Sequence, residues 1–145
     1  MAVGVRFVKL DPRAQVPTYG SAAAAGADLY ALKGAEIPAG ETVLIGTGIA
    51  LEIPEGYAGL IYARSGLASK RGLAPANKVG VIDADYRGEI LVALHNHGAE
   101  SQTVSEGERI AQLVVTPFLR VDFLESESLS DTDRGAGGFG STGKK

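Results

Sequence analysis

Hydrophobic residues recur along the chain in short alternating or continuous runs, and turn residues separate these runs. This pattern is typical of β-strands rather than helices. Turn signals recur every eight to twelve residues or so, and there are 20 glycines. We therefore expect an all-β chain, a jelly-roll-like β-barrel or sandwich. The predicted strands begin at Val3–Phe7 and continue at 28–31, 42–53, 57–63, 79–82, 90–94, 101–104, 110–116 and 118–124.

Only one helix is predicted, a short one over Ser65–Arg71 that ends at Gly72. The alanine run 21–25 has helical propensity, but Gly26 ends it well short of the ~12 residues that an isolated helix needs. An extended entry into the next strand is expected there instead.

The segment Val79–Leu94 consists of two apolar runs joined by a polar turn, which predicts a β-hairpin. Asp85 and Gly88 suit the first and fourth positions of a tight reversal. Asp83 lies before that reversal, at the end of a Val/Ile run, where an ionised carboxylate is costly unless it is paired, hydrated or used. The alternative is an Asp that flanks the turn and accepts bonds from nearby backbone amides.

The chain length of 145 residues corresponds to one domain. The strand pattern ends near Leu124, so residues 1–124 are predicted to form the core and residues 125–145 a flexible Gly-rich arm. Ile90–Leu94 is apolar on both faces of its strand. One face can fill the core, and the other is expected to be buried in an oligomer.

Composition excludes several classes of function. Lys+Arg 14 against Asp+Glu 17 gives a net charge of -3, without the basic field that nucleic-acid binding requires. With Cys 0, disulfides and thiolate metal sites are excluded. The N-terminal apolar run is interrupted too early by Arg6 and Lys9 to be a signal or membrane segment, so a soluble, cytoplasmic protein is expected.

The C-terminal run RGAGGFGSTGKK is rich in backbone amides that can surround phosphate oxygens. Arg134, Ser141 and Thr142 add further donors. The spacing of 138–144 fits part of a P-loop, but Lys145 replaces the required Ser/Thr and no strand precedes it, so a P-loop is rejected. A plain flexible tail is the alternative, yet such a tail has no need of the aromatic Phe139, which suggests a lid that stacks on a ring.

Other polar residues interrupt the strand pattern, and each has a structural alternative. Arg64-Ser65-Gly66 could converge on an anion at the start of the helix, or Ser65 could be an ordinary N-cap. Gln112 could serve a ligand or simply bridge strands. The remaining candidates are Asp28 as a partner of a hydrated cation or an exposed strand-edge carboxylate, Asn77 as a reader of a base edge or a turn cap, and His95 and His97 as metal ligands or an exposed pair.

Five segments of the chain resemble, in order, the five motifs of the homotrimeric dUTP nucleotidohydrolases (dUTPases). The segments are AGADLYA (25–31), ARSGLA (63–68), NKVGVIDADYRGEI (77–90), GERIAQLVV (107–115) and RGAGGFGSTG (134–143). The chain departs from the common family pattern at Ala27 and Ala63, where no functional group is removed.

The resemblance implies a homotrimer that hydrolyses dUTP to dUMP and pyrophosphate with Mg²⁺, keeping uracil out of DNA and supplying dUMP for thymidylate synthesis. Asp83 would be the general base for the attacking water. Asp28 and Gln112 would contact the waters of Mg²⁺, and Tyr86 would exclude a 2′-hydroxyl. The hairpin backbone around Val81 and the Asn77 amide would read uracil. Phosphate would be bound by Arg64, Ser65, Gly66, Arg134, Gly140, Ser141 and Thr142, with Phe139 stacked on uracil.

Two other functions remain open at this point. The related dCTP deaminases share the fold, but a deaminase would need a Glu base where Asp83 stands. A non-catalytic dUTP-binding regulatory module would not need the complete set of polar residues that the motifs contain.

Overall fold

The computed structural model describes residues 2–140 and 143, and it confirms a mostly β chain with one short helix. Within these residues the strands are β1 (Arg6–Lys9), β2 (Thr18–Tyr19), β3 (Ala27–Tyr30), β4 (Ala35–Ile37), β5 (Thr42–Glu52), β6 (Tyr57–Tyr62), β7 (Leu73–Pro75), β8 (Gly80–Ile82), β9 (Glu89–Asn96), β10 (Gln102–Val104) and β11 (Arg109–Pro117), and the helix is α1 (Ser65–Arg71). No helix in this part of the chain is long and apolar enough to cross a membrane.

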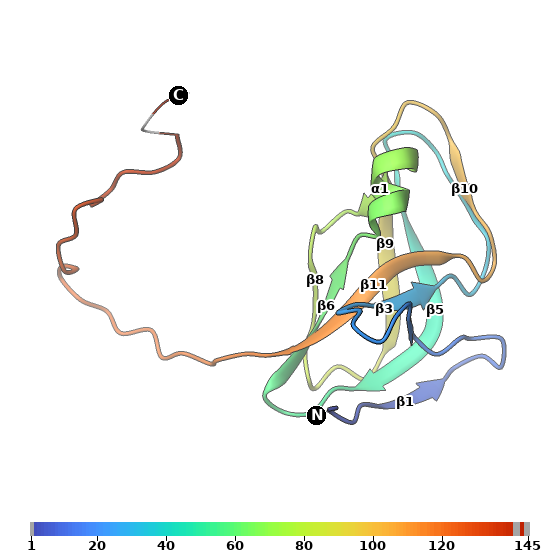
Figure 1. Cartoon of the computed structure of the whole chain (residues 1–145), viewed down its shortest axis with the longest axis horizontal. Coiled ribbons are helices and arrows are strands. Elements are labelled where there is room, and N and C mark those ends of the chain that lie inside the picture. The colour runs from blue at the N-terminus through green and yellow to red at the C-terminus, as the bar shows by residue number, and fades with distance from the viewer. Residues whose placement is uncertain (1, 141–142, 144–145) are drawn as a thin grey trace.

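Two antiparallel sheets enclose the core (Figure 1). One sheet has the strand order β1-β5-β9-β7 and the other the order β2-β3-β11-β6-β8, while β10 and β4 form a small third sheet. Side chains of both large sheets meet in a single apolar cluster, in which Leu29, Ile49, Leu94 and Ile110 are almost completely buried. Burial of this cluster provides the main favourable term in folding.

The outer face of the β5–β9 pair is apolar as well. Ile90, Val92 and Leu94 alternate inward along β9, while Leu91 points outward. On the neighbouring strand Leu44 is also strongly exposed. The second apolar face that the sequence predicts is therefore at the surface of the single chain.

The short helix has the predicted bounds. It begins at Ser65 and ends at Arg71, and Gly72 follows in the left-handed conformation with φ 66°. The Gly72 amide donates to the Leu67 carbonyl, which closes the last turn. Arg71 ties this end of the helix to the β10–β11 region through the side chains of Gln102 and Glu108. The position at which α1 passes into β7 is thereby fixed.

The predicted hairpin over 79–94 is wrong. β8 pairs with β6, with Ile82 opposite Gly59, whereas β9 pairs with β5 and β7 in the other sheet. The tight turn is also displaced toward the N-terminus, because the Tyr86 amide donates to the Asp83 carbonyl over 3.2 Å. A run of apolar residues predicts a strand but not its partner, and here each strand has found a partner elsewhere in the chain.

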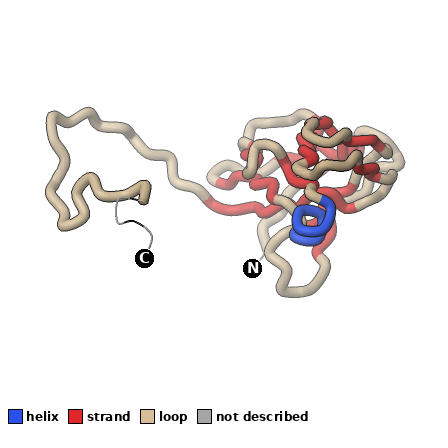
Figure 2. Tube along the Cα trace, turned by 90° about the horizontal axis from the view of Figure 1, so that it is seen from above, coloured by secondary structure: helices blue, strands red, loops and turns tan. Residues whose placement is uncertain are grey.

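The predicted strand over 118–124 is also wrong. After the Phe118 amide donates to the Gly56 carbonyl over 3.1 Å, the described chain has no regular structure and runs away from the barrel (Figures 1 and 2). Leu119, Phe123 and Leu124 are almost fully exposed. Strand-forming side chains do not make a strand when no sheet edge of the same chain is beside them.

Smaller differences concern short elements. The strands β2, β4 and β7 were not predicted, because two or three residues carry too little periodicity to recognise. The first strand lies over 6–9 rather than beginning at Val3. The alanine run is non-helical as expected, but it forms a turn rather than the expected extended entry, since the Ala24 amide donates to the Ser21 carbonyl.

Candidate functional site

A cavity of about 220 Å³ opens between β8 and the beginning of β9. Its apolar walls come from Ile61, Ile82 and Ile90, which belong to three different strands. Four of the predicted site residues line it: Asn77, Val81, Asp83 and Tyr86. The structure thus brings together the residues that the resemblance assigns to the base, the sugar and the attacking water.

Asp83 occupies the first position of the turn that follows β8. Its side chain is exposed, and it lines both this cavity and a second one beyond the turn. Asp85, two residues later, lines only the second of these two cavities. Of the two aspartates in the turn, Asp83 is therefore the one with access to the first cavity.

Arg87 stabilises this turn and was not predicted as part of the site. Its guanidinium donates to the Ala84 carbonyl over 2.6 Å and to the Tyr86 carbonyl over 3.3 Å. It also lies 3.5 Å from the carboxylate of Glu52 in β5. The sequence signal was an arginine within a turn-forming segment. That signal does not indicate which carbonyls the planar guanidinium can reach, so the role of Arg87 became clear only in the structure.

Asn77 lies in a strained connection just before β8. Lys78 has φ 53°, a left-handed value that a side chain with a Cβ adopts only at a cost of roughly 1 kcal/mol. The Val79 amide donates back to the Asn77 carbonyl over 2.7 Å. The Asn77 amide group is packed over Gly80, so that it faces the cavity from the start of the strand.

A second group of polar residues lies on the five-stranded sheet. Asp28 of β3 is directly opposite Gln112 of β11, and Gln112 is opposite Tyr62 of β6. Residues opposite each other in antiparallel strands are neighbours on one face. Two candidates that are far apart in the sequence are therefore adjacent in space, close to the end of β6 from which Arg64 follows.

The carboxylate of Asp28 is paired with two arginines. It accepts from Nε of Arg64 over 3.0 Å and lies 3.6 Å from Nη1 of Arg109. The Asp28 side chain is only 13% exposed, so that the pair with Arg64 is largely shielded from water. An exposed strand-edge carboxylate, the alternative for Asp28, is not what the structure contains. Arg109 is a further residue that sequence reasoning missed.

Gln112 makes the bridge that the alternative interpretation expected. Its Nε2 donates to the carbonyl of Ala63 over 2.8 Å, which links β11 to the segment that follows β6. Its side chain lies directly over Gly26, where a Cβ would be 3.0 Å from the Gln112 Cδ. The side-chain amide is therefore held over Gly26 by packing and by the hydrogen bond of its Nε2.

Ser65 is not an N-cap. It is the first residue of α1, and Arg64 is the capping position, without a hydrogen bond from its side chain. Ser65 and Gly66 are both exposed. They directly follow Arg64 in the sequence, and the guanidinium of Arg64 donates to Asp28 over 3.0 Å and to the Arg109 carbonyl over 3.4 Å.

The described residues contain no group of three or more His, Cys, Asp or Glu side chains that could hold a metal ion. Asp28, with Gln112 beside it, fits a role outside the first coordination shell, since its oxygens are paired with arginines. The rings of His95 and His97 pack edge to face, with their centroids 4.5 Å apart. Nδ1 of His95 forms a hydrogen bond with the Thr42 hydroxyl.

The arm residues are far from the cavity of their own chain (Figure 1). Arg134 begins a turn in which the Gly137 amide donates to its carbonyl over 3.0 Å. Phe139 is fully exposed and has φ 51°, and Gly140 has φ 82°. Ser141 and Thr142 lie outside the described residues. The arm and the cavity are thus not brought together within one chain.

The sequence is similar to known dUTPases over nearly its full length. The dUTPase family model matches residues 12–143. The deoxyuridine 5'-triphosphate nucleotidohydrolase of Nautilia profundicola is 50% identical over 140 residues, which cover 97% of this chain and 99% of that protein. The enzyme of the same name from Wolinella succinogenes is 51% identical over 140 residues, covering 97% and 94%.

Solved structures agree with the sequence comparison. The dUTPase of Staphylococcus bacteriophage 80alpha with dUPNHPP has a TM-score of 0.91 at 29% identity, covering 99% of this chain and 100% of that one. A mutant dUTPase from phage phi11 of S. aureus, described with the coordination of a structural Mg(II) ion, has a TM-score of 0.80 at 26% identity and covers 87% and 98%. The fold, the two polar groups and these similarities lead to one assignment: the chain belongs to the dUTPase family.

Proposed function

We propose that this protein hydrolyses dUTP to dUMP and pyrophosphate by attack of water on the α-phosphorus. The observation that supports this best is the position of Asp83 at the cavity between β8 and β9, beside Asn77 and Tyr86. A carboxylate, an amide and an aromatic ring around one small cavity suit a base, its sugar and a water to be activated.

Asp83 is proposed as the general base. It accepts a proton from the attacking water as the oxygen bonds to the α-phosphorus and the bond to pyrophosphate breaks. A carboxylate is a weak base, so the contribution of Asp83 depends on its orientation toward the attacking water. The turn that carries it is held by Arg87, which supplies that orientation from outside the cavity.

The triphosphate is proposed to lie toward Arg64, Ser65 and Gly66, whose charge and backbone amides suit phosphate oxygens. Mg²⁺, when bound to the phosphates, would neutralise charge in the transition state. Asp28 and Gln112 would contact the water molecules bound to it, which fits the tendency of Mg²⁺ to keep several of its waters in protein sites. At the γ-phosphate the arm residues Arg134, Gly140, Ser141 and Thr142 would close the site.

Specificity is proposed to come from backbone and amide groups around Asn77 and Val81, which read the edge of uracil. A site built to hydrogen-bond one edge can reject a mismatched one by up to about 10⁴- to 10⁵-fold. Thymine would be excluded by its methyl group. Tyr86 would occupy the place of a 2′-hydroxyl, and Phe139 would stack on the base, which is worth ~1–3 kcal/mol.

We further propose a homotrimer in which each site takes residues from more than one chain. The exposed apolar face of Leu44 and Leu91 and the exposed side chains of 118–124 support association of copies. The direction of the arm, away from its own barrel, supports closure over another copy (Figure 2). Molar mass in solution by light scattering tests the trimer, and a monomer at micromolar concentration would contradict it.

The activity is tested by pyrophosphate release from dUTP, dTTP, dCTP and UTP. The wild type should release it from dUTP alone at an appreciable rate, and Asp83→Asn should be strongly impaired. Asp85→Asn is the matched control, because it neutralises a carboxylate of the same turn that does not line the first cavity. Equal rates for wild type and Asp83→Asn would refute the base assignment, and ammonia release from dCTP would indicate a deaminase.

The shared site is tested by mixing two inactive chains. A chain truncated after Leu124 retains Asp83, and full-length Asp83→Asn retains the arm. Trimers refolded from the mixture should regain activity, because some sites then combine an intact Asp83 with an intact arm. Activity of the truncated chain equal to wild type would remove the arm from the mechanism.

A further inference from the structure

The Tyr86 side chain folds back along its own turn. Its hydroxyl donates to the main-chain carbonyl of Glu89 over 2.8 Å. The ring then crosses the place where residue 88 would carry a Cβ. A Cβ built on Gly88 would be 2.5 Å from the Tyr86 hydroxyl oxygen and 2.7 Å from Cζ, closer than real Cβ atoms come.

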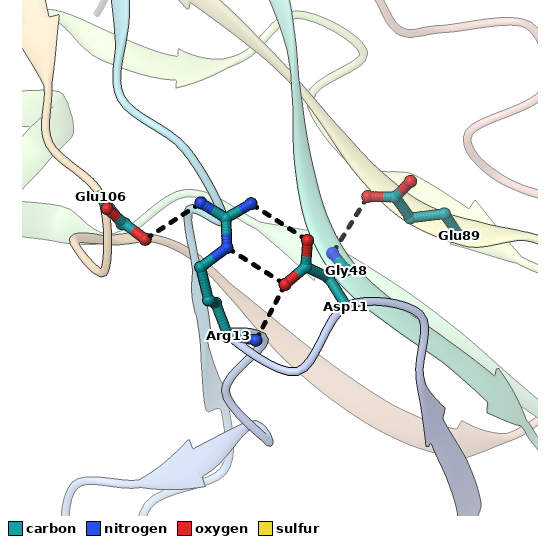
Figure 3. Close-up of polar contacts among 5 residues, drawn as sticks. All are labelled: Asp11, Arg13, Gly48, Glu89 and Glu106. Carbon is teal, nitrogen blue, oxygen red and sulfur yellow. Dashed lines mark hydrogen bonds and ion pairs between the residues drawn. The ribbon is translucent and has the colours of Figure 1, made fainter.

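The acceptor of this hydrogen bond is itself fixed to the neighbouring strand. Glu89 is the first residue of β9, and its Oε2 accepts from the backbone amide of Gly48 in β5 over 3.0 Å. Figure 3 shows this carboxylate turned toward the Gly48 nitrogen. The Glu89 carbonyl is therefore held in place, and the Tyr86 hydroxyl is bonded to a rigid part of the sheet.

These contacts decide which part of Tyr86 a ligand can meet. The hydroxyl is engaged with the backbone, while the side chain is 44% exposed and lines the cavity together with Asp83. Tyr86 thus presents its ring, and the position of the ring depends on the missing side chain at residue 88. Gly88 is not among the glycines with positive φ, so its backbone would accept alanine without strain.

We propose that Gly88 is a specificity-determining positioning residue, which selects 2′-deoxynucleotides by allowing the Tyr86 ring to lie against the turn. This inference rests on the proposed function, in which Tyr86 excludes a 2′-hydroxyl. An added Cβ requires the ring to move by about 1 Å to restore ordinary carbon contacts of ~3.5–4.0 Å. The ring then leaves the place in which it would collide with the hydroxyl of a ribose.

The test compares Gly88→Ala with wild type in kcat/KM for dUTP and for UTP. The ratio of the two values should fall by about 10- to 100-fold, since a displacement of about 1 Å at a site can change rates by that order. Gly20→Ala is the matched control, because a Cβ there meets nothing within 4 Å and its backbone is not in the positive-φ region. Its ratio should equal that of wild type.

A second comparison shows whether Gly88 acts through Tyr86. In a Tyr86→Ala background the clash is absent, so adding Gly88→Ala should leave the dUTP/UTP ratio unchanged. A further fall in that background, or failure of Gly88→Ala to fold with and without Tyr86, would overturn the proposal. Folding of the double variant but not of Gly88→Ala alone would support it.

A readout without turnover separates this inference from the proposed function. The NMR signals of the Tyr86 ring, assigned by comparison with Tyr86→Phe, should shift in Gly88→Ala without any nucleotide. If wild type fails to hydrolyse dUTP, the proposed function is wrong, whatever the ring signals show. If wild type is active and Gly88→Ala retains the wild-type ratio, only the role of Gly88 is wrong.

Discussion

Replacing Asp28 with Asn tests how firmly the arginine of the phosphate-binding segment is held. The carboxylate of Asp28 has two cationic neighbours at different distances, Nε of Arg64 at 3.0 Å and Nη1 of Arg109 at 3.6 Å. Asn has nearly the same shape as Asp but no charge. The substitution therefore removes the electrostatic part of both contacts and leaves the packing of β3 unchanged.

The two contacts should contribute differently. The Arg64 contact is short and directed, and both side chains are mostly shielded, with 28% and 13% exposed. Charge-assisted hydrogen bonds of this kind are worth ~1.5–3 kcal/mol. The Arg109 contact is longer, and its arginine is 51% exposed, which places it in the range of surface pairs, about 0–1 kcal/mol. Asp28→Asn should thus lower the free energy of unfolding by about 2 kcal/mol.

Urea unfolding at a fixed protein concentration measures this value. Double-mutant cycles with Arg64→Gln and Arg109→Gln then separate the two pairs. The coupling of Asp28 to Arg64 should exceed its coupling to Arg109 by about 1 kcal/mol or more. Equal couplings, or a larger one for Arg109, would refute the reasoning, because distance and shielding would then not determine the strength of these pairs.

Three other changes have clear expected outcomes. Gly26→Ala places a Cβ 3.1 Å from the Cβ of Gln112 and displaces the Gln112 amide. The rate of dUTP hydrolysis should therefore fall, and the free energy of unfolding measured in urea should drop by about 1–3 kcal/mol. Gly20→Ala, where a Cβ meets nothing within 4 Å, should change neither quantity. Asn96→Leu removes the partners of the Ile37 and Glu100 carbonyls and the Gly98 amide at a fully buried position, so unfolding by urea should become easier by more than ~3 kcal/mol. Hydrogen bonds from the Arg13 side chain and backbone lower the pKa of Asp11 from 3.8 to about 2 (Figure 3). The pair therefore stabilises the fold above pH 3.8, and this contribution is lost as the pH falls through 2. NMR titration of the Asp11 carboxyl measures the pKa, and urea unfolding of Asp11→Asn should show a stability that lacks this pH dependence.

Local signals in the sequence were sufficient for elements that local interactions determine. The helix Ser65–Arg71 has its bounds set by a strand that ends before it and by Gly72 after it, and both can be recognised without knowledge of the fold. The all-β class followed from many such short signals taken together.

Pairing between distant strands could not be obtained in this way. The pairing of Asp28 with Gln112 depends on the register of β3 against β11, and the residue pattern of each strand indicates only which face a residue occupies, not which residue of a distant strand lies opposite it. The same limit applies to Arg87, because its contact with Glu52 joins the turn after β8 to the end of β5, which is distant in the sequence. Motif resemblance identified Asp28 and Gln112 as site residues, whereas their adjacency became visible only in the fold.

The separation of β8 from β9, which replaces the predicted hairpin, has a functional consequence. In a hairpin, the backbone groups of 80–82 and 89–91 would be consumed in bonds to one another. Instead β8 is the edge strand of its sheet. One edge of β8 pairs with β6, and its other edge is unpaired and borders the cavity. β7 covers β9 only over 94–96, so residues 89–91 line the cavity from the opposite side. The unpaired edge of β8 therefore borders the cavity, whereas the carbonyls of Glu89 and Ile90 are bonded to Tyr86 and Thr47, so a flat base could be recognised by the backbone groups of β8.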